Sequence, residues 1–421
     1  VEVCLALPSD SERGAYLDEI AVGSPELVAR VRDLLKMHEE AEGRGFLPPD
    51  PEGNDLGDSD EGGLGIPAGE VAEGTQIRRY KLLERIGEGG MGVVFMAEQE
   101  EPVRRRVAVK IIKLGMDTKQ VVARFEAERQ ALAMMDNPNI AKLLDAGVTE
   151  AGRPYFVMEL VRGIAVTKYC EENKLSIRER LLLFIPVCHA IQHAHQKGVI
   201  HRDIKPSNIL VTQSGGRPHP MVIDFGVAKA TNQRLTDKTF FTRFTQMVGT
   251  PPYMSPEQAE MSAQDVDTRS DVYALGILLY ELLTGATPFP TERLSSAGLA
   301  EMQRIIKEEE PLRPSTMISQ TGDRSDSVSA DGGLDRAASA KAIKGELDWI
   351  VLRAIDKDRG RRYETANGLA VDVQRYLDDE PVDAAAPTMG YRFQKLARRH
   401  KAALAAGASV VIALLLGTVV S

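Results

Sequence analysis

Apolar residues fall into short runs up to residue 160 and into longer runs after it. Short runs rich in β-branched and aromatic residues predict strands at 80–86, 93–95, 107–112 and 155–160. Longer apolar runs predict helices at 176–197 and 271–283, and the second is apolar almost throughout. The pattern therefore predicts a strand-rich region followed by a helical one, with residues 271–283 at the buried centre of the helical part.

The first 74 residues have a different character. Residues 1–42 predict a short helical region, because Ser24 and Pro25 form a helix start and apolar residues follow at helical spacing. We interpret this region as a small packing or adaptor element. Residues 43–74 are rich in Gly, Pro and Asp and contain little apolar material to bury, which predicts a disordered acidic linker, with an interaction tail as the alternative.

The C-terminal end predicts a membrane helix. Residues 402–420 are nineteen consecutive uncharged residues rich in Ala, Leu and Val, and a helix of that length spans about 28 Å, close to the hydrocarbon core of a bilayer. Residues 381–401 form a basic juxtamembrane segment that contains Arg392, Lys395, Arg398, Arg399 and Lys401. Positive charge marks the cytoplasmic flank, so the preceding region is expected inside the cell and anything beyond Ser421 outside it. A buried soluble helix is the alternative for 402–420.

Composition excludes some classes of protein. A content of 43% hydrophobic and 27% charged residues fits an ordinary globular chain, and a net charge of −9 gives no reason to expect a nucleic-acid partner. The three cysteines are far apart without a CxxC pair, which argues against a disulfide framework or a zinc site and suits a reducing compartment. The chain begins with Val1 rather than Met, which suggests a piece of a longer protein.

The octet from His201 to Asn208 carries the densest chemistry in the chain. Asp203 could accept the proton of a hydroxyl, Lys205 could neutralise a phosphoryl group, and Asn208 could bind a metal ion. Phosphoryl transfer needs this division of roles, because positioning and charge neutralisation supply most of the catalysis. The octet therefore predicts a phosphoryl-transfer site.

A glycine-rich turn precedes the octet at residues 87–92, between the first two predicted strands. A dinucleotide fingerprint would need a helix directly after the glycines, whereas β-branched and aromatic residues follow here. The pattern therefore favours a strand–turn–strand flap over phosphates. Lys110 lies on the next strand, where it could reach the phosphates if an acidic residue holds it. Glu128 is the candidate partner because it falls beside the apolar side of its predicted helix, and Glu126 is the rival.

The run Met221 to Gly226 reads as a strand followed by a turn, and it places Asp224 shortly after the octet. Together these motifs resemble the eukaryotic-like serine/threonine protein kinases of bacteria, of the membrane-anchored receptor type, over about residues 80–380. The resemblance implies an α+β, two-lobed kinase fold, with a β-rich N-lobe at 75–160 and a helical C-lobe at 161–380. It also implies ATP as phosphoryl donor and Mg²⁺ as the metal, with Mn²⁺ as an alternative ion.

The resemblance assigns roles to individual residues. Asp203 would be the base or would position the acceptor hydroxyl, Lys205 would stabilise developing charge, and Asn208 and Asp224 would bind Mg²⁺. ATP would contact the flap, the lysine strand and the hinge, at Ile86, Gly87, Gly89, Gly92, Val94, Ala108, Lys110, Glu128, Met158, Glu159 and Val161.

Residues 227–257 would be the activation segment, and Arg202 beside Asp203 is typical of kinases switched by phosphate on that segment. We expect autophosphorylation at Thr242 and Thr245. Thr250 would hydrogen-bond the catalytic Asp and Lys. The expected structural contacts are an ion pair between Glu257 and Arg362 and bonds from Asp271 to the catalytic-loop backbone. Ser255, where the family more commonly has Ala, is expected to change little.

Residues 319–343, rich in Ser, Asp and Gly, predict a mobile insertion, and Trp349 in the next helix is expected in the core. The expected partners are proteins bearing Ser or Thr, a second copy during trans-autophosphorylation, and the membrane. The expected location is the bacterial inner membrane, crossed once, with the kinase domain in the cytoplasm. A membrane-anchored pseudokinase and a kinase acting on small molecules are the alternatives.

Overall fold

The computed structural model describes residues 72–89, 92–112, 135–225, 251–260, 266–322 and 336–385, together with Lys395. The predicted N-terminal helical region, nearly all of the acidic linker and the predicted membrane helix at 402–420 lie outside these residues. Among the residues that are described, no helix combines the length and the apolar character needed to cross a bilayer.

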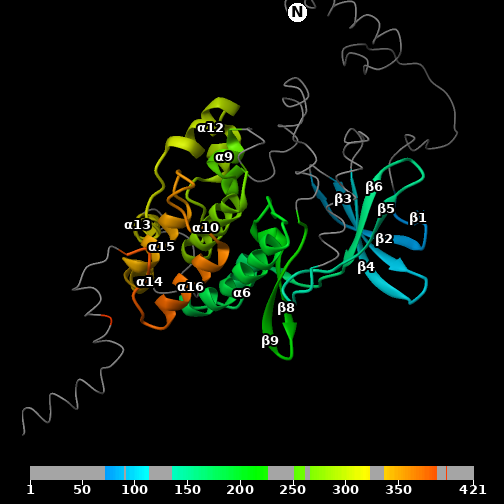
Figure 1. Ribbon diagram of the computed structural model, residues 1–421, viewed down its shortest axis with the longest axis horizontal. Helices are drawn as coiled ribbons and strands as arrows, with labels where there is room; N and C mark the ends of the chain where they lie inside the picture. Colours follow the sequence, from blue (N-terminus) through cyan, green and yellow to red (C-terminus); the bar gives the residue numbers. More distant parts are fainter. Residues whose placement is uncertain are drawn as a thin grey trace, which may run out of the picture. The chain divides into compact units, whose positions relative to one another are not determined.

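A six-stranded antiparallel sheet forms the N-terminal lobe, with the strand order β1-β2-β3-β4-β6-β5 (Figure 1). The strands are β1 (Gln76–Ile77), β2 (Tyr80–Gly89), β3 (Gly92–Gln99), β4 (Arg105–Ile112), β5 (Leu143–Val148) and β6 (Pro154–Glu159). Alternate side chains of the strands point to opposite faces, so one face collects the apolar side chains. Tyr80, Leu82, Phe95, Val109 and Val157 belong to the resulting buried cluster.

Gly92 begins β3 at a point where the backbone of β4 leaves no room for a side chain. A Cβ atom there would lie 2.3 Å from the carbonyl oxygen of Ile111. The glycine therefore lets the two strands pair from the first residue after the turn, with Val94 opposite Lys110.

A small second sheet and a set of helices form the C-terminal lobe. The sheet contains β7 (Ile164–Ala165), β8 (Ile209–Ser214) and β9 (Arg217–Val222). The helices are α5 (Val166–Glu172), α6 (Ile177–Gln196), α9 (Pro256–Ala259), α10 (Thr268–Thr284), α11 (Thr291–Ser296), α12 (Leu299–Glu308), α13 (Pro314–Gly322), α14 (Arg336–Ile343), α15 (Glu346–Ala354) and α16 (Ala366–Leu377), with 3-10 turns η1 (Pro206–Asn208) and η2 (Pro251–Tyr253).

Helix α10 lies at the centre of this lobe and packs against α6, α15 and α16 (Figure 1). Most of its side chains are buried, as the apolar run predicts. Asp267 caps its N-terminus by accepting a hydrogen bond from the N–H of Arg269 at 2.7 Å. At Gly276 a Cβ atom would lie 2.7 Å from the Cβ of Ala354, so α10 and α15 approach closely there.

In the C-terminal lobe, the bounds of the expected insertion need correction and the expected position of Trp349 is wrong. The ends of the predicted insertion, 319–322 and 336–343, belong to helices α13 and α14, which contact each other, while residues 323–335 lie outside the described structure. Trp349 is 37% exposed rather than part of the core. The side of α15 that packs into the lobe carries Leu347, Ile350 and Val351 instead.

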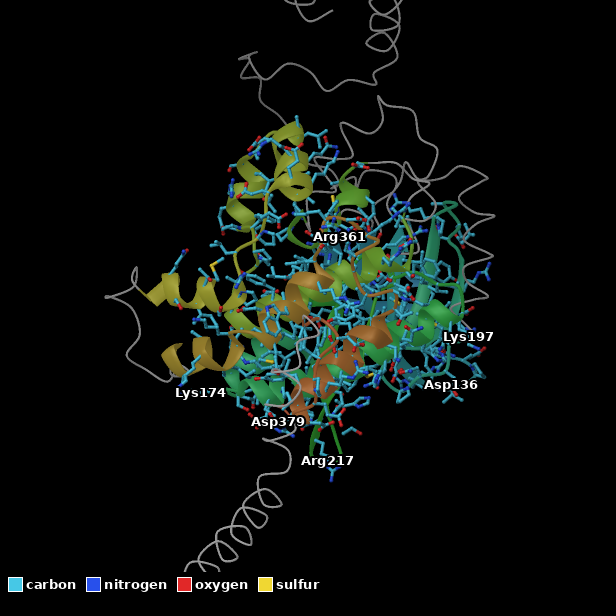
Figure 2. All side chains as sticks on the ribbon, turned by 60° about the vertical axis from the view of Figure 1, so that its left-hand side comes forward. Asp136, Lys174, Lys197, Arg217, Arg361 and Asp379 are labelled. Carbon is cyan, nitrogen blue, oxygen red and sulfur yellow. The ribbon has the colours of Figure 1, made fainter. Side chains whose placement is uncertain are left out.

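The chain after α16 stays in contact with the C-terminal lobe. The buried carboxylate of Asp372 accepts hydrogen bonds from the N–H groups of Asp383 and Ala384 at 2.6 and 3.0 Å. Lys395 is buried, and its Nζ lies 2.7 Å from Glu346 and 3.7 Å from Asp379, which Figure 2 labels. The segment predicted to lead to the membrane is thus attached to α15 and α16 at two points.

Candidate active site

The catalytic loop, residues 201–208, follows α6, and its backbone is bound by Asp271 of α10. Asp271 is 1% exposed, and its carboxylate accepts hydrogen bonds from the N–H groups of His201 and Arg202, both at 2.8 Å. It also lies 2.7 Å from Nε2 of His195. Burial by itself would raise the pKa of Asp271, but the bonds from His195 and the backbone outweigh it and hold the pKa below its usual value. A charged Asp271 therefore fixes the start of the loop.

His201 is fully buried and contacts two residues that directly follow β9 or lie close to its end. Its ring packs on Phe225 with 4.6 Å between centroids, and its Nε2 lies 3.2 Å from the carbonyl oxygen of Ile223. Burial lowers the pKa of His201, which favours the neutral ring. With Nδ1 accepting from the N–H of Asp203 at 3.3 Å, the proton belongs on Nε2. His201 thus joins the catalytic loop to the strand end that carries Asp224.

Asp203, Lys205 and Asn208 converge as the sequence predicts. Nζ of Lys205 lies 2.9 Å from Oδ2 of Asp203. The 3-10 turn η1 brings Asn208 back toward Asp203, and its Nδ2 donates to the carbonyl oxygen of Asp203 at 2.8 Å and to Oδ2 at 3.1 Å. Since the amide nitrogen of Asn208 is used in this way, its amide oxygen is the atom that would bind a metal ion.

Pairing between β8 and β9 brings Asn208 close to Asp224. Ile209 lies opposite Val222, and the N–H of Ile223 donates to the carbonyl oxygen of Asn208 at 2.9 Å. Asp224 follows with φ of 60°, a left-handed conformation that is uncommon outside glycine and concentrates at functional sites. Two oxygen-bearing side chains therefore lie at paired strand ends, Asn208 directly before β8 and Asp224 shortly after β9.

Lys110 links the N-terminal sheet to this region. Its Nζ forms an ion pair and a hydrogen bond with Oδ1 of Asp224, and both side chains are largely buried. Glu128, the partner expected from the sequence, and its rival Glu126 lie outside the described residues. The structure thus assigns Lys110 a partner that the sequence does not suggest.

The donors fit a magnesium ion. Magnesium takes oxygen ligands, keeps several waters, and needs only one or two protein carboxylates with substrate phosphates. Asp224 and Asn208 supply one carboxylate and one amide oxygen beside a lysine ammonium. Within the described residues there is no group of three His, Cys, Asp or Glu side chains placed to bind a metal.

The expected nucleotide-binding residues lie on neighbouring strands. Val94 pairs with Gly87 across β2 and β3, and Ala108 pairs with Met158 across β4 and β6. The N–H of Glu159 donates to the carbonyl oxygen of Lys142 at 2.9 Å. The N–H of Glu159 is therefore already engaged by the backbone of Lys142.

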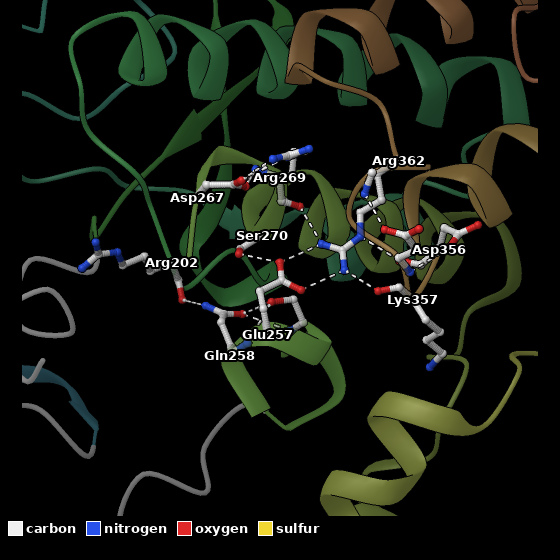
Figure 3. A network of polar contacts seen from close by, with 12 residues as sticks. Arg202, Glu257, Gln258, Asp267, Arg269, Ser270, Asp356, Lys357 and Arg362 are labelled. Carbon is white, nitrogen blue, oxygen red and sulfur yellow. Dashed lines mark hydrogen bonds and ion pairs between the residues drawn. The ribbon is translucent and has the colours of Figure 1, made fainter. Parts of the chain in front are cut away.

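The C-terminal anchor of the activation segment is an ion pair, shown in Figure 3. Arg362, 2% exposed, donates to both carboxylate oxygens of Glu257 at 2.7 and 2.8 Å. The Ser270 hydroxyl donates to Oε1 of Glu257 at 2.6 Å. Burial alone would raise the pKa of Glu257, but Arg362 lowers it below its usual value. The expected pair is present, whereas Thr242, Thr245 and Thr250 lie outside the described residues.

The hydroxyl of Ser255 does more than the sequence suggests. It accepts a hydrogen bond from the N–H of Gln258 at 3.4 Å, and the side chain of Gln258 bonds back to the N–H of Ser255 at 3.0 Å. This is a capping box at the start of α9. The spacing of Ser255 and Gln258 in the sequence was the signal that could have revealed it.

Comparisons with known proteins show what the chain is similar to. A family model described as "Protein kinase domain" matches residues 80–363. Serine/threonine-protein kinase pkn3 of Myxococcus xanthus is 36% identical over 74% of this chain and 56% of its own length. Serine/threonine-protein kinase PrkC of Bacillus subtilis is 34% identical over 71% of this chain and 41% of its own length. The chain thus spans about half or less of the length of these relatives.

Among solved structures, the kinase domain of Mycobacterium tuberculosis PknI matches 73% of this chain and 99% of its own, with a TM-score of 0.52 at 22% identity. At that identity the match concerns the fold alone. It supports the arrangement of an N-terminal sheet and a helical C-terminal lobe.

Proposed function

The chain belongs to the protein kinase family, and we propose that it transfers the γ-phosphoryl group of ATP to serine or threonine hydroxyls of proteins. The observation that carries the proposal is the convergence of Asp203, Lys205 and Asn208 with Asp224 and Lys110, which come from both lobes. The expectation of a serine/threonine kinase agrees with the names of the relatives.

The residues of the catalytic loop would act on the acceptor. Asp203 would orient the hydroxyl and take its proton, since its carboxylate is held by Asn208 and Lys205 rather than left to rotate. Lys205, already beside Asp203, would balance negative charge that develops on the transferred group. Both roles depend on positioning, which supplies most of the rate enhancement in phosphoryl transfer.

Residues of the N-terminal sheet, together with Asp224 and Asn208, would bind the nucleotide and its metal ion. Lys110 would bind phosphate oxygens while it remains close to Asp224, and the glycine-rich turn between β2 and β3 would cover them. Asp224 and Asn208 would bind Mg²⁺, or Mn²⁺ in its place, which neutralises charge on the phosphates. Adenine would lie against Ala108, Met158 and the carbonyl of Glu159.

The test of the activity is incorporation of labelled phosphate from Mg-ATP by the chain and by its Asp203→Asn variant. We expect incorporation by the wild type and at least a hundredfold loss in the variant. Identification of phosphoserine or phosphothreonine by mass spectrometry would support the acceptor class, and modified Thr242 or Thr245 would support autophosphorylation. ATP binding without any turnover would instead support a pseudokinase.

We further propose a single-pass anchor in the bacterial inner membrane with the kinase domain in the cytoplasm. Its support is the uncharged run at 402–420 after the basic segment 381–401. Fractionation of cells that express the chain or a version ending at residue 401 tests this. We expect the full chain to remain with membranes after a carbonate wash and the shorter chain to be released. Equal release of both would contradict the anchor.

A further inference from the structure

The first turn of α9 contacts the catalytic loop through Gln258. Nε2 of Gln258 donates to the carbonyl oxygen of Arg202 at 3.3 Å, a contact drawn in Figure 3. Oε1 of the same side chain accepts from the N–H and the hydroxyl of Ser255 at 3.0 and 3.1 Å. In this orientation the amide nitrogen of Gln258 faces an acceptor and its amide oxygen faces donors. The flipped amide would place its oxygen against the carbonyl oxygen of Arg202, where no donor would remain.

The backbone that Gln258 contacts is in an unfavourable conformation. Arg202 has φ of 62°, a left-handed conformation that is unfavourable for an L-residue and persists only where the surroundings enforce it. Asp271 holds one side of Arg202 by accepting from its N–H at 2.8 Å. Gln258 holds the other side, at the carbonyl of the peptide bond that leads directly into Asp203.

We infer that Gln258 is a positioning residue for Asp203, acting through the Arg202 carbonyl. The inference rests on the proposed kinase function, in which Asp203 must point at the acceptor hydroxyl. Gln258 directly follows Glu257, which Arg362 anchors, so its donor is presented from a rigid point. The end of the activation segment would in this way set the direction of the catalytic carboxylate.

The exchange Gln258→Glu separates this role from helix capping. A glutamate keeps an acceptor for the N–H of Ser255, and Glu is a preferred residue at this position of a capping box. It removes the donor to the Arg202 carbonyl and places a carboxylate oxygen there instead. We expect kcat to fall about tenfold, as for loss of one partly buried hydrogen bond, with the KM for ATP changed less than about twofold.

Glu179 offers a matched control for the exchange at Gln258, because it occupies the same position of another capping box. Ser176 and Glu179 form a second capping box at the start of α6, where the N–H of Ser176 donates to Oε2 of Glu179 at 2.8 Å. Glu179→Gln makes the reverse exchange in the same motif, and the contacts of Glu179 within the described structure are to Ser176. We expect its kcat and KM to equal those of the wild type.

A second pair of variants serves if Gln258→Glu folds poorly. Ser255→Ala removes the capping hydroxyl and leaves Nε2 of Gln258 on the Arg202 carbonyl, whereas Gln258→Met removes that donor. We expect near wild-type kcat for Ser255→Ala and a loss of about tenfold for Gln258→Met. Equal kcat values in both variants would overturn the inference, as would wild-type kcat in a folded Gln258→Glu.

Hydrogen exchange of the peptide covering 201–208 gives a readout that does not require turnover. We expect faster exchange in Gln258→Glu than in the wild type and in Glu179→Gln. Unchanged exchange would overturn the inference even if the wild-type chain proved inactive. Inactivity of the wild type with the expected exchange pattern would contradict the proposed function alone.

Discussion

Arg362 binds both carboxylate oxygens of Glu257 through hydrogen bonds of 2.7 and 2.8 Å, although 105 positions separate the two residues. Further N–H groups of Arg362 donate to the carbonyl oxygens of Asp356 and Arg269 at 2.7 and 3.1 Å. The pair therefore joins α9, the start of α10 and the turn before α16. Loss of this one ion pair would therefore weaken the contacts among three segments of the C-terminal lobe.

Glu257→Gln should destabilise the fold by about 3–5 kcal/mol, because it leaves the guanidinium of Arg362 buried without a countercharge. Urea unfolding followed by circular dichroism measures the effect. Glu301→Gln is the control, because its pair with Arg304 is about half exposed and should contribute no measurable stability. Similar unfolding midpoints for the Glu257 variant and the control would contradict the prediction.

The same residue predicts a pH dependence. The pKa of Glu257 is lower in the folded chain than its ordinary value of 4.5, so its contribution to stability is complete above that value. The contribution is lost as the pH falls through the folded pKa. The difference in unfolding free energy between wild type and Glu257→Gln should accordingly shrink as the pH falls below 4.5 and through the lower pKa of folded Glu257. A difference that stayed constant across this range would show that the charge of Glu257 is not responsible.

Asp224→Asn should raise the Mg²⁺ concentration needed for half-maximal ATP binding by about tenfold or more, since a neutral amide replaces the one carboxylate of the expected metal site. It also removes the ion-pair partner of Lys110. Titration calorimetry with ATP at several Mg²⁺ concentrations measures the shift. Asp136→Asn, at an exposed carboxylate paired with Lys142, should leave the titration unchanged. The assignment fails if the two variants behave alike.

Gly92→Ala should lower the stability of the N-terminal sheet by roughly 1–3 kcal/mol, because the new methyl group would meet the carbonyl oxygen of Ile111. Gly89→Ala is the matched control on the other side of the turn, where no described atom lies within 4 Å of the added Cβ. Differential scanning calorimetry compares the two. A lower Tm for Gly89→Ala than for Gly92→Ala would be inconsistent with the strand geometry.

Lys395→Met should release the chain around residue 395 from the C-terminal lobe, because it removes the cation that lies 2.7 Å from Glu346, while the bonds of Asp383 and Ala384 to Asp372 remain. Limited trypsin digestion provides the measurement, with cleavage at 398–401 expected several times faster in the variant. Lys341→Met, at an exposed lysine of α14, should cleave there like the wild type. Unchanged cleavage in Lys395→Met would mean that the ion pair does not hold the segment.

Much of the fold could be predicted because its signals are local. Short runs rich in β-branched and aromatic residues located β2, β3, β4 and β6, and the capping pattern at Ser176 agrees with a helix that begins at Ile177. Trp349 was misplaced because a large apolar residue in an amphipathic helix is usually buried, whereas here its neighbours Leu347 and Ile350 occupy the buried side of α15. The type of one residue does not show which side of its helix is buried.

By itself the sequence determined which groups could carry chemistry and which segments would be strand or helix, since both follow from residue types at short spacings. The resemblance also implied the backbone contacts of Asp271 and the pair of Glu257 with Arg362, but only the tertiary structure decided two further long-range contacts. Lys110 contacts Asp224 across 114 positions, and Gln258 reaches the Arg202 carbonyl across 56. Such contacts depend on how whole helices and strands pack against one another. Many side chains could satisfy the same donor or acceptor, so the packing of the two lobes decides which of them meet.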